Sequence, residues 1–354
     1  MDCDSNYNVN MKELIILFTL SYFFTNAQMR DSSRILSFET IPPELETDPV
    51  ISSDDAADDV CIWYNPKDSN RSIVVGTDKK WGLISYALNG SILSKSPFGK
   101  INNIDIYEDF SYQGGAYPLL FGSNRSEKTI DIYRLFPDGK LQRLNQIKVP
   151  ELREVYGITF YGGEQHRYVF LSDKKGRIQQ WMFGLRGDLP DLKLLRTLKV
   201  KSTVEGMVAD EHYEKLYIAE ENKGLWEVNV LPWKDKAFQL LIATDKDQLL
   251  ADFEGITLME RPNGEGMIFI SIQGNNAYGV VDRKSKKFLG GFRIGNNNDI
   301  DAVDDTDGID LATFSSRLFP QGVFIAQDGY NGAENQNYKF VDLGRILDYI
   351  NQKP

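Results

Sequence analysis

The sequence has few of the residues on which several common architectures and chemistries depend. Its 354 residues include two cysteines and two histidines. The two cysteines, Cys3 and Cys61, are too few for a disulfide-built scaffold. Basic residues are also in deficit, with 40 Lys and Arg against 51 Asp and Glu and a net charge of −11, so no nucleic-acid partner is expected. An apolar content of 42% is typical of a globular protein with a substantial core.

The sequence also lacks an apolar run long enough to span a membrane. The longest run follows Met11, extends from Leu14 to Phe24 and ends at the small-residue stretch Thr25–Ala27. This order predicts a secretory signal over residues 1–27, with translation starting at Met11; a buried N-terminal helix is the alternative. We therefore expect a secreted or periplasmic protein without a membrane anchor, whose mature chain is a single domain over residues 28–354.

A short β-strand pattern recurs six times along the chain, at intervals of about 50 residues. A second apolar segment precedes each run, and further strand patterns follow several of them after turn signals such as Asn89-Gly90. Four strands per repeat and six repeats predict a six-bladed β-propeller with four-stranded antiparallel blades, because a β-sandwich does not explain the sixfold period. The six runs are SIVVGTDKK from Ser72, PLLFGSNRS from Pro118, RYVFLSDKK from Arg167, KLYIAEENK from Lys215, MIFISIQGN from Met267 and GVFIAQDGY from Gly322.

Equivalent positions of different blades lie on a ring around the axis of a propeller. At the entrance to the first strand of each repeat, this ring would contain Asp59, Asn103, Tyr156, Glu205, Glu254 and Asp307. Carboxylates gathered in this way repel one another unless their pKa values rise or cations bind. An all-oxygen set suits Ca²⁺, whereas Zn²⁺ favours His or Cys ligands, and neither histidine falls in this column.

Basic residues follow the second strand in the first three repeats. Lys79, Arg125 and Lys174 occupy one column of the alignment, and Lys80 comes one position later in the first repeat. A metal-filled acidic ring beside Lys80, Arg125 and Lys174 would suit a densely anionic ligand, and phosphate is the obvious candidate. A solvated charge pattern is the alternative.

Several motifs occur in an order that resembles the β-propeller phytases. The resemblance runs from about Thr47 to Phe340. It departs from the family where Val60 and Cys61 replace the usual Pro-Ala, and where Arg153 replaces an Asp or His. The matching motifs are DDAADDVCIW at 54–63, Lys79-Lys80 followed by Gly82, NNIDI at 102–106, SNRSE at 123–127, EVYGITFY at 154–161, TVEGMVAD at 203–210, LYIAEE at 216–221, DFEGITL at 252–258, SIQGNNAY at 271–278, DTDGID at 305–310 and FIAQDG at 324–329.

This resemblance implies a secreted, calcium-dependent phosphomonoesterase of the 3-phytase type. Its substrate would be phytate, myo-inositol hexakisphosphate, bound as a calcium complex and attacked by a calcium-bound water. Catalytic roles would fall to Tyr156, Glu205, Glu254 and Lys80. Phosphate or substrate would be bound by Lys80, Arg125, Lys174, Asp105, Asp252 and Gln273. Several calcium ions would be held by Asp59, Asn103, Tyr156, Glu205, Glu254, Asp307 and Asp301, and a structural calcium site would involve Asp48 and Asn331.

Two other functions stay open at the level of sequence. Calcium-dependent lactonases and arylesterases share the six-bladed architecture and an acidic channel mouth, although they would not need the cationic cluster. A non-catalytic binding propeller is the second alternative. The sequence has neither an RHG-type histidine motif nor a C-x₅-R loop, so a phospho-histidine or phospho-cysteine route is not expected. With no added domain recognised, a monomer is expected.

Overall fold

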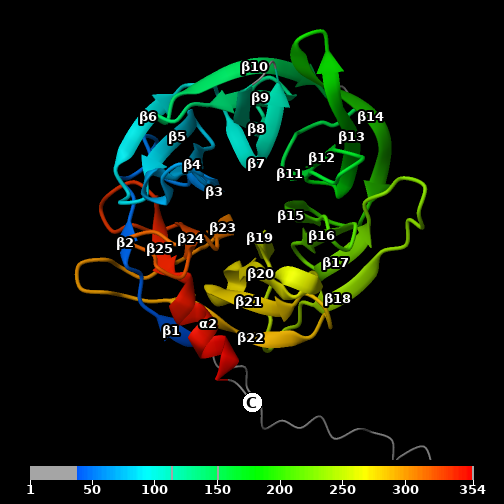
Figure 1. Cartoon of the computed structure of the whole chain (residues 1–354). Coiled ribbons are helices and arrows are strands. Elements are labelled where there is room, and N and C mark those ends of the chain that lie inside the picture. Colours follow the sequence, from blue (N-terminus) through cyan, green and yellow to red (C-terminus); the bar gives the residue numbers. More distant parts are fainter. Residues whose placement is uncertain (1–37, 113–114, 150, 353–354) are drawn as a thin grey trace, which may run out of the picture. The chain divides into compact units, whose positions relative to one another are not determined.

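The computed structural model describes residues 38–112, 115–149 and 151–352, and these residues form a six-bladed β-propeller around a central axis (Figure 1). The predicted fold class is therefore confirmed. The first strand of each blade lies next to the axis, and later strands lie progressively further out.

The first four blades follow the order of the chain. Their neighbouring strands pair antiparallel, as the alternating strand and turn signals predict. Blade 1 contains β3 (Ala57–Trp63), β4 (Ile73–Asp78), β5 (Gly82–Ala87) and β6 (Ile92–Ser96). Blade 2 contains β7 (Ile101–Tyr112), β8 (Gly115–Asn124), β9 (Thr129–Leu135) and β10 (Leu141–Lys148). Blade 3 contains β11 (Ile158–Tyr161), β12 (Tyr168–Ser172), β13 (Arg177–Arg186) and β14 (Leu189–Lys199), and blade 4 contains β15 (Val204–Asp210), β16 (Lys215–Glu220), β17 (Gly224–Asn229) and β18 (Gln239–Ala243).

The last two blades incorporate strands from the start of the described chain. Two short strands precede blade 1. Strand β1 (Glu39–Ile41) pairs parallel with β22 (Phe288–Ile294), and β2 (Leu45–Glu46) pairs antiparallel with β25 (Asn337–Asp342). The propeller therefore closes by joining both ends of the described chain within blades 5 and 6. Blade 5 contains β19 (Phe253–Glu260), β20 (Gly266–Ile272), β21 (Ala277–Asp282), β22 (Phe288–Ile294) and β1, and blade 6 contains β23 (Ile309–Ala312), β24 (Val323–Asp328), β25 (Asn337–Asp342) and β2.

Helical segments are short, and the α-helix α2 (Leu343–Asn351) caps the outside of this closure. Its buried Ile346 and Ile350 pack with Ile294 and Phe324 of blades 5 and 6. The 3₁₀ segments are η1 (Ser69–Arg71), η2 (Pro262–Gly264) and η3 (Gln273–Asn275). Among the residues that the structure describes, no helix has the length and apolarity needed to cross a membrane.

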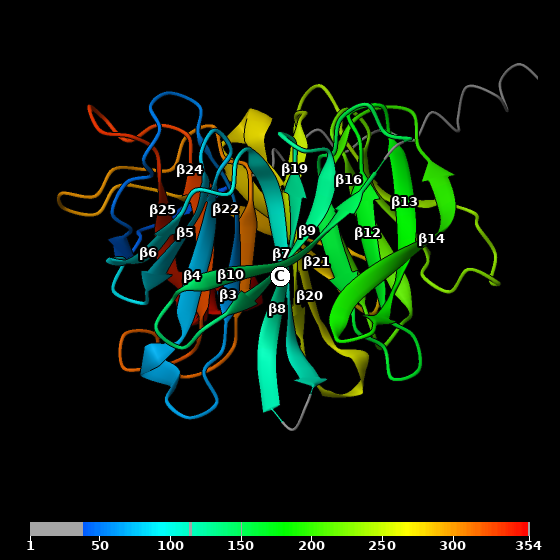
Figure 2. The ribbon, with the colours of Figure 1, turned by 90° about the horizontal axis from the view of Figure 1, so that it is seen from above.

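Apolar layers between neighbouring blades make up the core. Val60 packs with Tyr338 and Phe340 between blades 1 and 6, whereas Cys61 packs with Ile104 between blades 1 and 2. Both residues at which the sequence departs from the phytase pattern are thus buried packing residues. Figure 2 shows β7 and β8 extending, at one end, past the strands of the neighbouring blades. The predicted signal segment, residues 1–27, lies outside the described residues and stays a prediction.

Candidate functional site

The inner strands of several blades begin with an irregularity that turns polar side chains toward the axis. The pairing of β3 with β4 shifts register between Ala57 and Val60, and β7 shifts between Ile101 and Ile104. The first strands of blades 4 and 5 shift in the same way. Bulges of this kind re-aim side chains beside functional sites. The residues inside these four bulges include Asp58, Asn102, Glu205 and Glu254.

The strand pairing defines which positions of the six blades are equivalent. In each blade, the reference is the inner-strand residue that pairs with one fixed position of the second strand, namely Gly76, Gly122, Leu171, Ile218, Ile270 or Ala326. The inner-strand residues two positions before this reference form a ring, which consists of Asp58, Asn102, Tyr156, Glu205, Glu254 and Asp307. Four of these residues belong to the column predicted from the sequence. In blades 1 and 2 the structure places Asp58 and Asn102 in the ring, and Asp59 and Asn103 one residue further along the strand.

Glycine follows the ring residue in blades 3 to 6, and close packing explains why. A Cβ at Gly206 would lie 2.0 Å from the carbonyl oxygen of Glu254, and one at Gly157 would lie 1.9 Å from that of Glu205. The amide of Gly308 donates to the carbonyl of Asp58 at 2.9 Å, which links blade 6 to blade 1. These glycines therefore bring the ring residues of adjacent blades close together.

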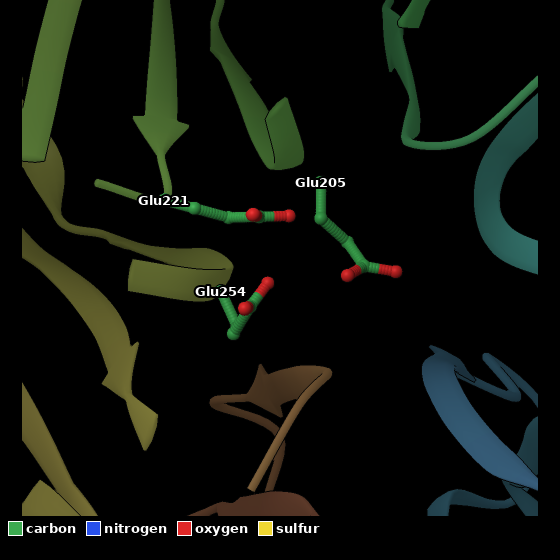
Figure 3. A group of neighbouring side chains, drawn as sticks. All are labelled: Glu205, Glu221 and Glu254. Carbon is green, nitrogen blue, oxygen red and sulfur yellow. The ribbon is translucent and has the colours of Figure 1, made fainter. Parts of the chain in front are cut away.

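Three carboxylates meet at one side of the ring (Figure 3). One oxygen from each of Glu205, Glu221 and Glu254 lies within 4.8 Å of the other two. In Figure 3 the carboxylates of Glu221 and Glu254 point toward Glu205. Atom Oε2 of Glu254 is buried and has no hydrogen-bond partner among the residues that the structure describes. A buried oxygen left unpaired among oxygen donors fits a hard divalent cation such as Ca²⁺.

Crowding and burial hold the carboxyl groups near the axis partly neutral. Burial raises the pKa of Asp58 to about 8, and the charge of Glu205 adds to the effect. Burial also raises the pKa of Glu205 to about 7, with a further contribution from Asp307. The pKa of Glu254 lies well above its usual range because it is buried beside Glu205 and Glu221. A bound divalent cation would favour the ionised forms and reverse these shifts.

Lys79 contacts the ring carboxylates of blades 1 and 6, and Asn102 connects Asp58 to Glu205 of the carboxylate cluster. The Lys79 ammonium lies 2.9 Å from Asp58 and 3.7 Å from Asp307. Burial alone would lower the pKa of Lys79, but the charges of Asp58 and Asp307, together with hydrogen bonds to Asp55 and Asp58, outweigh burial and raise the pKa. The Asn102 amide donates to Asp58 at 2.5 Å and to Glu205 at 2.7 Å. Gln273 donates to Asp307 at 2.8 Å, so this predicted substrate residue contacts the ring.

The other predicted cations lie around the same ring. Arg125 donates to the Asn102 side-chain oxygen at 2.9 Å, and the Lys174 ammonium lies 4.5 Å from the centre of the Tyr156 ring. Lys80, in contrast, extends outward, where its ammonium donates to the carbonyl of Ser53 at 2.6 Å. Lys79 is therefore the blade 1 lysine that contacts the ring, and Lys80 lies at its rim.

Below the ring, carboxylates tie neighbouring inner strands together. Asp59 accepts a hydrogen bond from the amide of Ile104, and Asp105 accepts from the amide of Phe160, at 3.0 and 2.7 Å. Asp310 accepts from the amide of Ile62 at 2.9 Å in the same manner. Together with Asn103, these three residues line a narrow cavity of about 60 Å³ along the axis. Asp105 thus lies inside the channel, although the sequence places it among the substrate-binding residues.

The remaining predicted residues have separate surroundings. Asp252 lies beside Glu221 and contributes to raising the pKa of that carboxyl group, after burial. Asp301 contacts the buried Lys339 at 2.6 Å and not the ring carboxylates. Asp48 accepts from the Ile92 amide, whereas Asn331 donates to the Asn335 carbonyl. Asp48 and Asn331 therefore have different partners, and their structural calcium site stays a prediction.

Sequence reasoning missed four residues of the site: Asp58, Asn102, Glu221 and Lys79. Asp58 and Asn102 each stand beside an identical residue, so the sequence alone offers two equal choices for the ring. Glu221 was missed because the strand pairing in blades 4 and 5 differs by one residue from the alignment of the six sequence runs. The strand pairing places it at the position of Lys79, Arg125 and Lys174. The signal for Lys79 was its place in the cationic column.

Comparisons with known proteins found similar proteins over most of the chain. The family whose sequence pattern matches residues 11–354 is described as Phytase. A 3-phytase of Bacillus subtilis (strain 168) is 38% identical over 325 residues, covering 87% of this chain and 85% of that protein. A solved structural genomics protein of unknown function from Bacteroides thetaiotaomicron VPI-5482 matches with a TM-score of 0.56 at 10% identity. That match covers 86% of this chain and 75% of the other, and it shows likeness of fold alone.

Proposed function

The chain belongs to the phytase family and hydrolyses phosphate monoesters of phytate, myo-inositol hexakisphosphate, and we propose that calcium ions and the surrounding cations together bind this substrate. The observation that carries the proposal is the meeting of Glu205, Glu221 and Glu254 within 4.8 Å of one another. The cationic residues around the same ring support it, because a carboxylate cluster alone would repel phosphate.

Calcium would be held by the carboxylates and the phenol of the ring. The donors would include Glu205, Glu221 and Glu254, whose carboxylates lie close together. Asp58, Asp307 and Tyr156 of the same ring would complete an all-oxygen set of the kind that Ca²⁺ prefers. Bound calcium would neutralise the phosphate dianion and make a water molecule more acidic. Asp59 and Asn103, one residue deeper, would support the ring from the channel wall.

The phosphate groups would be bound by Lys79, Arg125 and Lys174. Arg125 can bind a phosphate in a bidentate manner, and the two lysines add positive charge where negative charge accumulates during transfer. Lys80 would contact another phosphate of the hexakisphosphate at the rim, and Gln273 and Asp252 would border the same cleft. The catalytic role predicted for Lys80 stays a prediction.

Proton transfer would use the groups nearest the carboxylate cluster. With a divalent cation favouring its ionised form, Glu254 would be able to accept a proton from an attacking water, because its Oε2 has no hydrogen-bond partner among the described residues. Tyr156 is kept protonated, because burial and the charge of Glu205 raise the pKa of its phenol far above the usual range. The phenol can therefore hold the Glu205 carboxylate in place by donating to it.

Phosphate release from phytate near neutral pH tests the proposal directly. We expect release with Ca²⁺ present and its loss when a chelator is added. Glu254→Gln should remove activity and weaken calcium binding, measured by calorimetry. Hydrolysis of a lactone or aryl ester in place of phytate would favour the lactonase alternative. Phytate hydrolysis that persists after complete calcium removal would contradict the metal assignment.

A further inference from the structure

The guanidinium of Arg125 is held from two sides. One terminal nitrogen, Nη1, donates to the side-chain oxygen of Asn102 at 2.9 Å, and the other, Nη2, lies 2.5 Å from Oε1 of Glu154. The backbone amide of Arg125 donates to the carbonyl of Lys100 at 2.8 Å. A guanidinium has five N–H donors in one plane, so two anchors fix the plane and still leave donors for a phosphate.

Glu154 is well placed to act as a fixed anchor. It lies in the segment that precedes β11, between Leu152 and Val155, both of which are buried in the apolar layer between blades 2 and 3. The Glu154 side chain is 37% exposed. Asp55, which lies 2.5 Å from Lys79, is 73% exposed and so is less constrained. The backbone under Glu154 is thus held by packing, while its carboxylate reaches Arg125 in blade 2.

We propose that Glu154 is a positioning residue, which fixes the guanidinium of Arg125 in the orientation that binds the phosphate being transferred. This inference rests on the proposed role of Arg125 in phosphate binding. Asn102 connects the same guanidinium to Asp58 and Glu205. Glu154 therefore completes a line of contacts from the blade 3 segment, through Arg125, to the carboxylate ring.

Removing the anchor should reduce turnover more than binding. Without the Glu154 oxygen, Arg125 is held by Asn102 alone and can swing about that contact. Loss of a charge-assisted hydrogen bond of this kind predicts a decrease in kcat of about tenfold for Glu154→Ala. KM should change little, because Lys79, Lys174 and the remaining phosphates still bind the substrate. Glu154→Gln keeps an oxygen at the same place and should recover most of the activity.

A double-mutant cycle on the calcium-loaded enzyme tests this inference. The variants are Glu154→Ala, Arg125→Ala and the double variant, with phosphate release from phytate giving kcat and KM for each. If Glu154 acts through Arg125, Glu154→Ala costs nothing further once Arg125 is absent. Glu127→Ala is the matched control: it removes a carboxylate two residues from Arg125 that pairs instead with Lys148 at 3.5 Å, and it should leave kcat unchanged.

The outcomes separate this inference from the proposed function. Equal losses from Glu154→Ala with and without Arg125 would overturn the positioning role, as would a Glu154→Gln variant no better than Glu154→Ala. Full activity of Arg125→Ala would instead overturn the assignment of Arg125 to phosphate and, with it, the role of Glu154. Thermal melting of each variant checks folding, and Glu154→Gln provides the folded comparison if Glu154→Ala does not fold.

Discussion

Replacing Glu205 by glutamine removes one negative charge from the carboxylate cluster while keeping the size of the side chain and an oxygen that can accept from Asn102. In the calcium-free protein, that charge lies in a buried position beside Glu254 and near Asp307. The pKa of Glu205 is about 7 in the folded state, because burial and the charge of Asp307 oppose ionisation. The ordinary value for a glutamate side chain is 4.5. Folding therefore becomes less favourable when Glu205 ionises.

The sign and size follow from this difference. Below pH 4.5 the Glu205 carboxyl group is protonated in both the folded and the unfolded state, so no free energy of folding is lost to its ionisation. Between pH 4.5 and about 7 the unfolded chain ionises first, and stability is lost as the pH rises. A pKa difference of about 2.5 corresponds to about 3 kcal/mol, at ~1.4 kcal/mol per pH unit. Glu205→Gln should therefore stabilise the calcium-free protein at pH 9 by about 3 kcal/mol, and by much less at pH 5.

Urea unfolding followed by tryptophan fluorescence, in chelator at pH 5 and pH 9, measures this effect. With Ca²⁺ added, the order should reverse at pH 9, because the wild type gains binding free energy that the variant partly lacks. Glu127→Gln, which changes an exposed carboxylate, is the control and should show no such dependence on pH. An equal effect of Glu205→Gln at both pH values would refute the electrostatic explanation.

Three further predictions concern calcium, the cations and the close packing of the ring. In chelator, the melting temperature of the wild type should fall from pH 5 to pH 9, because carboxyl groups with raised pKa values ionise in this interval. Saturating Ca²⁺ should remove that fall. An identical pH profile with and without Ca²⁺ would contradict the metal site. Lys79→Ala should lower kcat for phytate by about 100-fold, since it removes a cation from the transferring phosphate. Lys80→Ala should instead raise KM by about threefold. Steady-state kinetics would show the reverse order if Lys80 is the catalytic lysine. Gly206→Ala should destabilise the protein by about 1–3 kcal/mol in urea unfolding, because its Cβ would lie 2.0 Å from the Glu254 carbonyl oxygen. Gly184→Ala, where a Cβ would meet nothing within 4 Å, should cost little by comparison.

The blade architecture could be predicted from the sequence because each repeat contains its own strand and turn signals. An inner strand such as Ile256–Leu258 alternates apolar positions, and turns such as Asn89-Gly90 mark hairpin ends. The closure was not predictable in the same way. β1 and β2 are three and two residues long, and their pairing with β22 and β25 depends on contacts between the two ends of the described chain.

The ring was predictable in the blades where glycine marks the register. Tyr156, Glu205, Glu254 and Asp307 each precede a glycine, and that pair of residues fixes the alignment. Blades 1 and 2 have no such marker, since Asp58 and Asp59 are the same residue type. Only the bulge between Ala57 and Val60 decides which carboxylate enters the ring. A bulge is a property of strand pairing, so a local sequence pattern does not determine it.

The net charge of −11 also has a more specific meaning in the folded protein. A protein with this charge should repel a hexakisphosphate unless negative and positive groups are separated within the site. The inner strands supply the carboxylates, and the loops after the second strands supply Lys79, Arg125 and Lys174, so the two sets come from different segments of each blade. Glu221 interrupts the cationic set in blade 4 and joins the carboxylates of Glu205 and Glu254. The same repeat position thus provides cations in blades 1 to 3 and a carboxylate in blade 4. Under the proposed function, the cations would bind phosphate and the carboxylate would bind calcium, which would allow an acidic protein to bind a more acidic substrate.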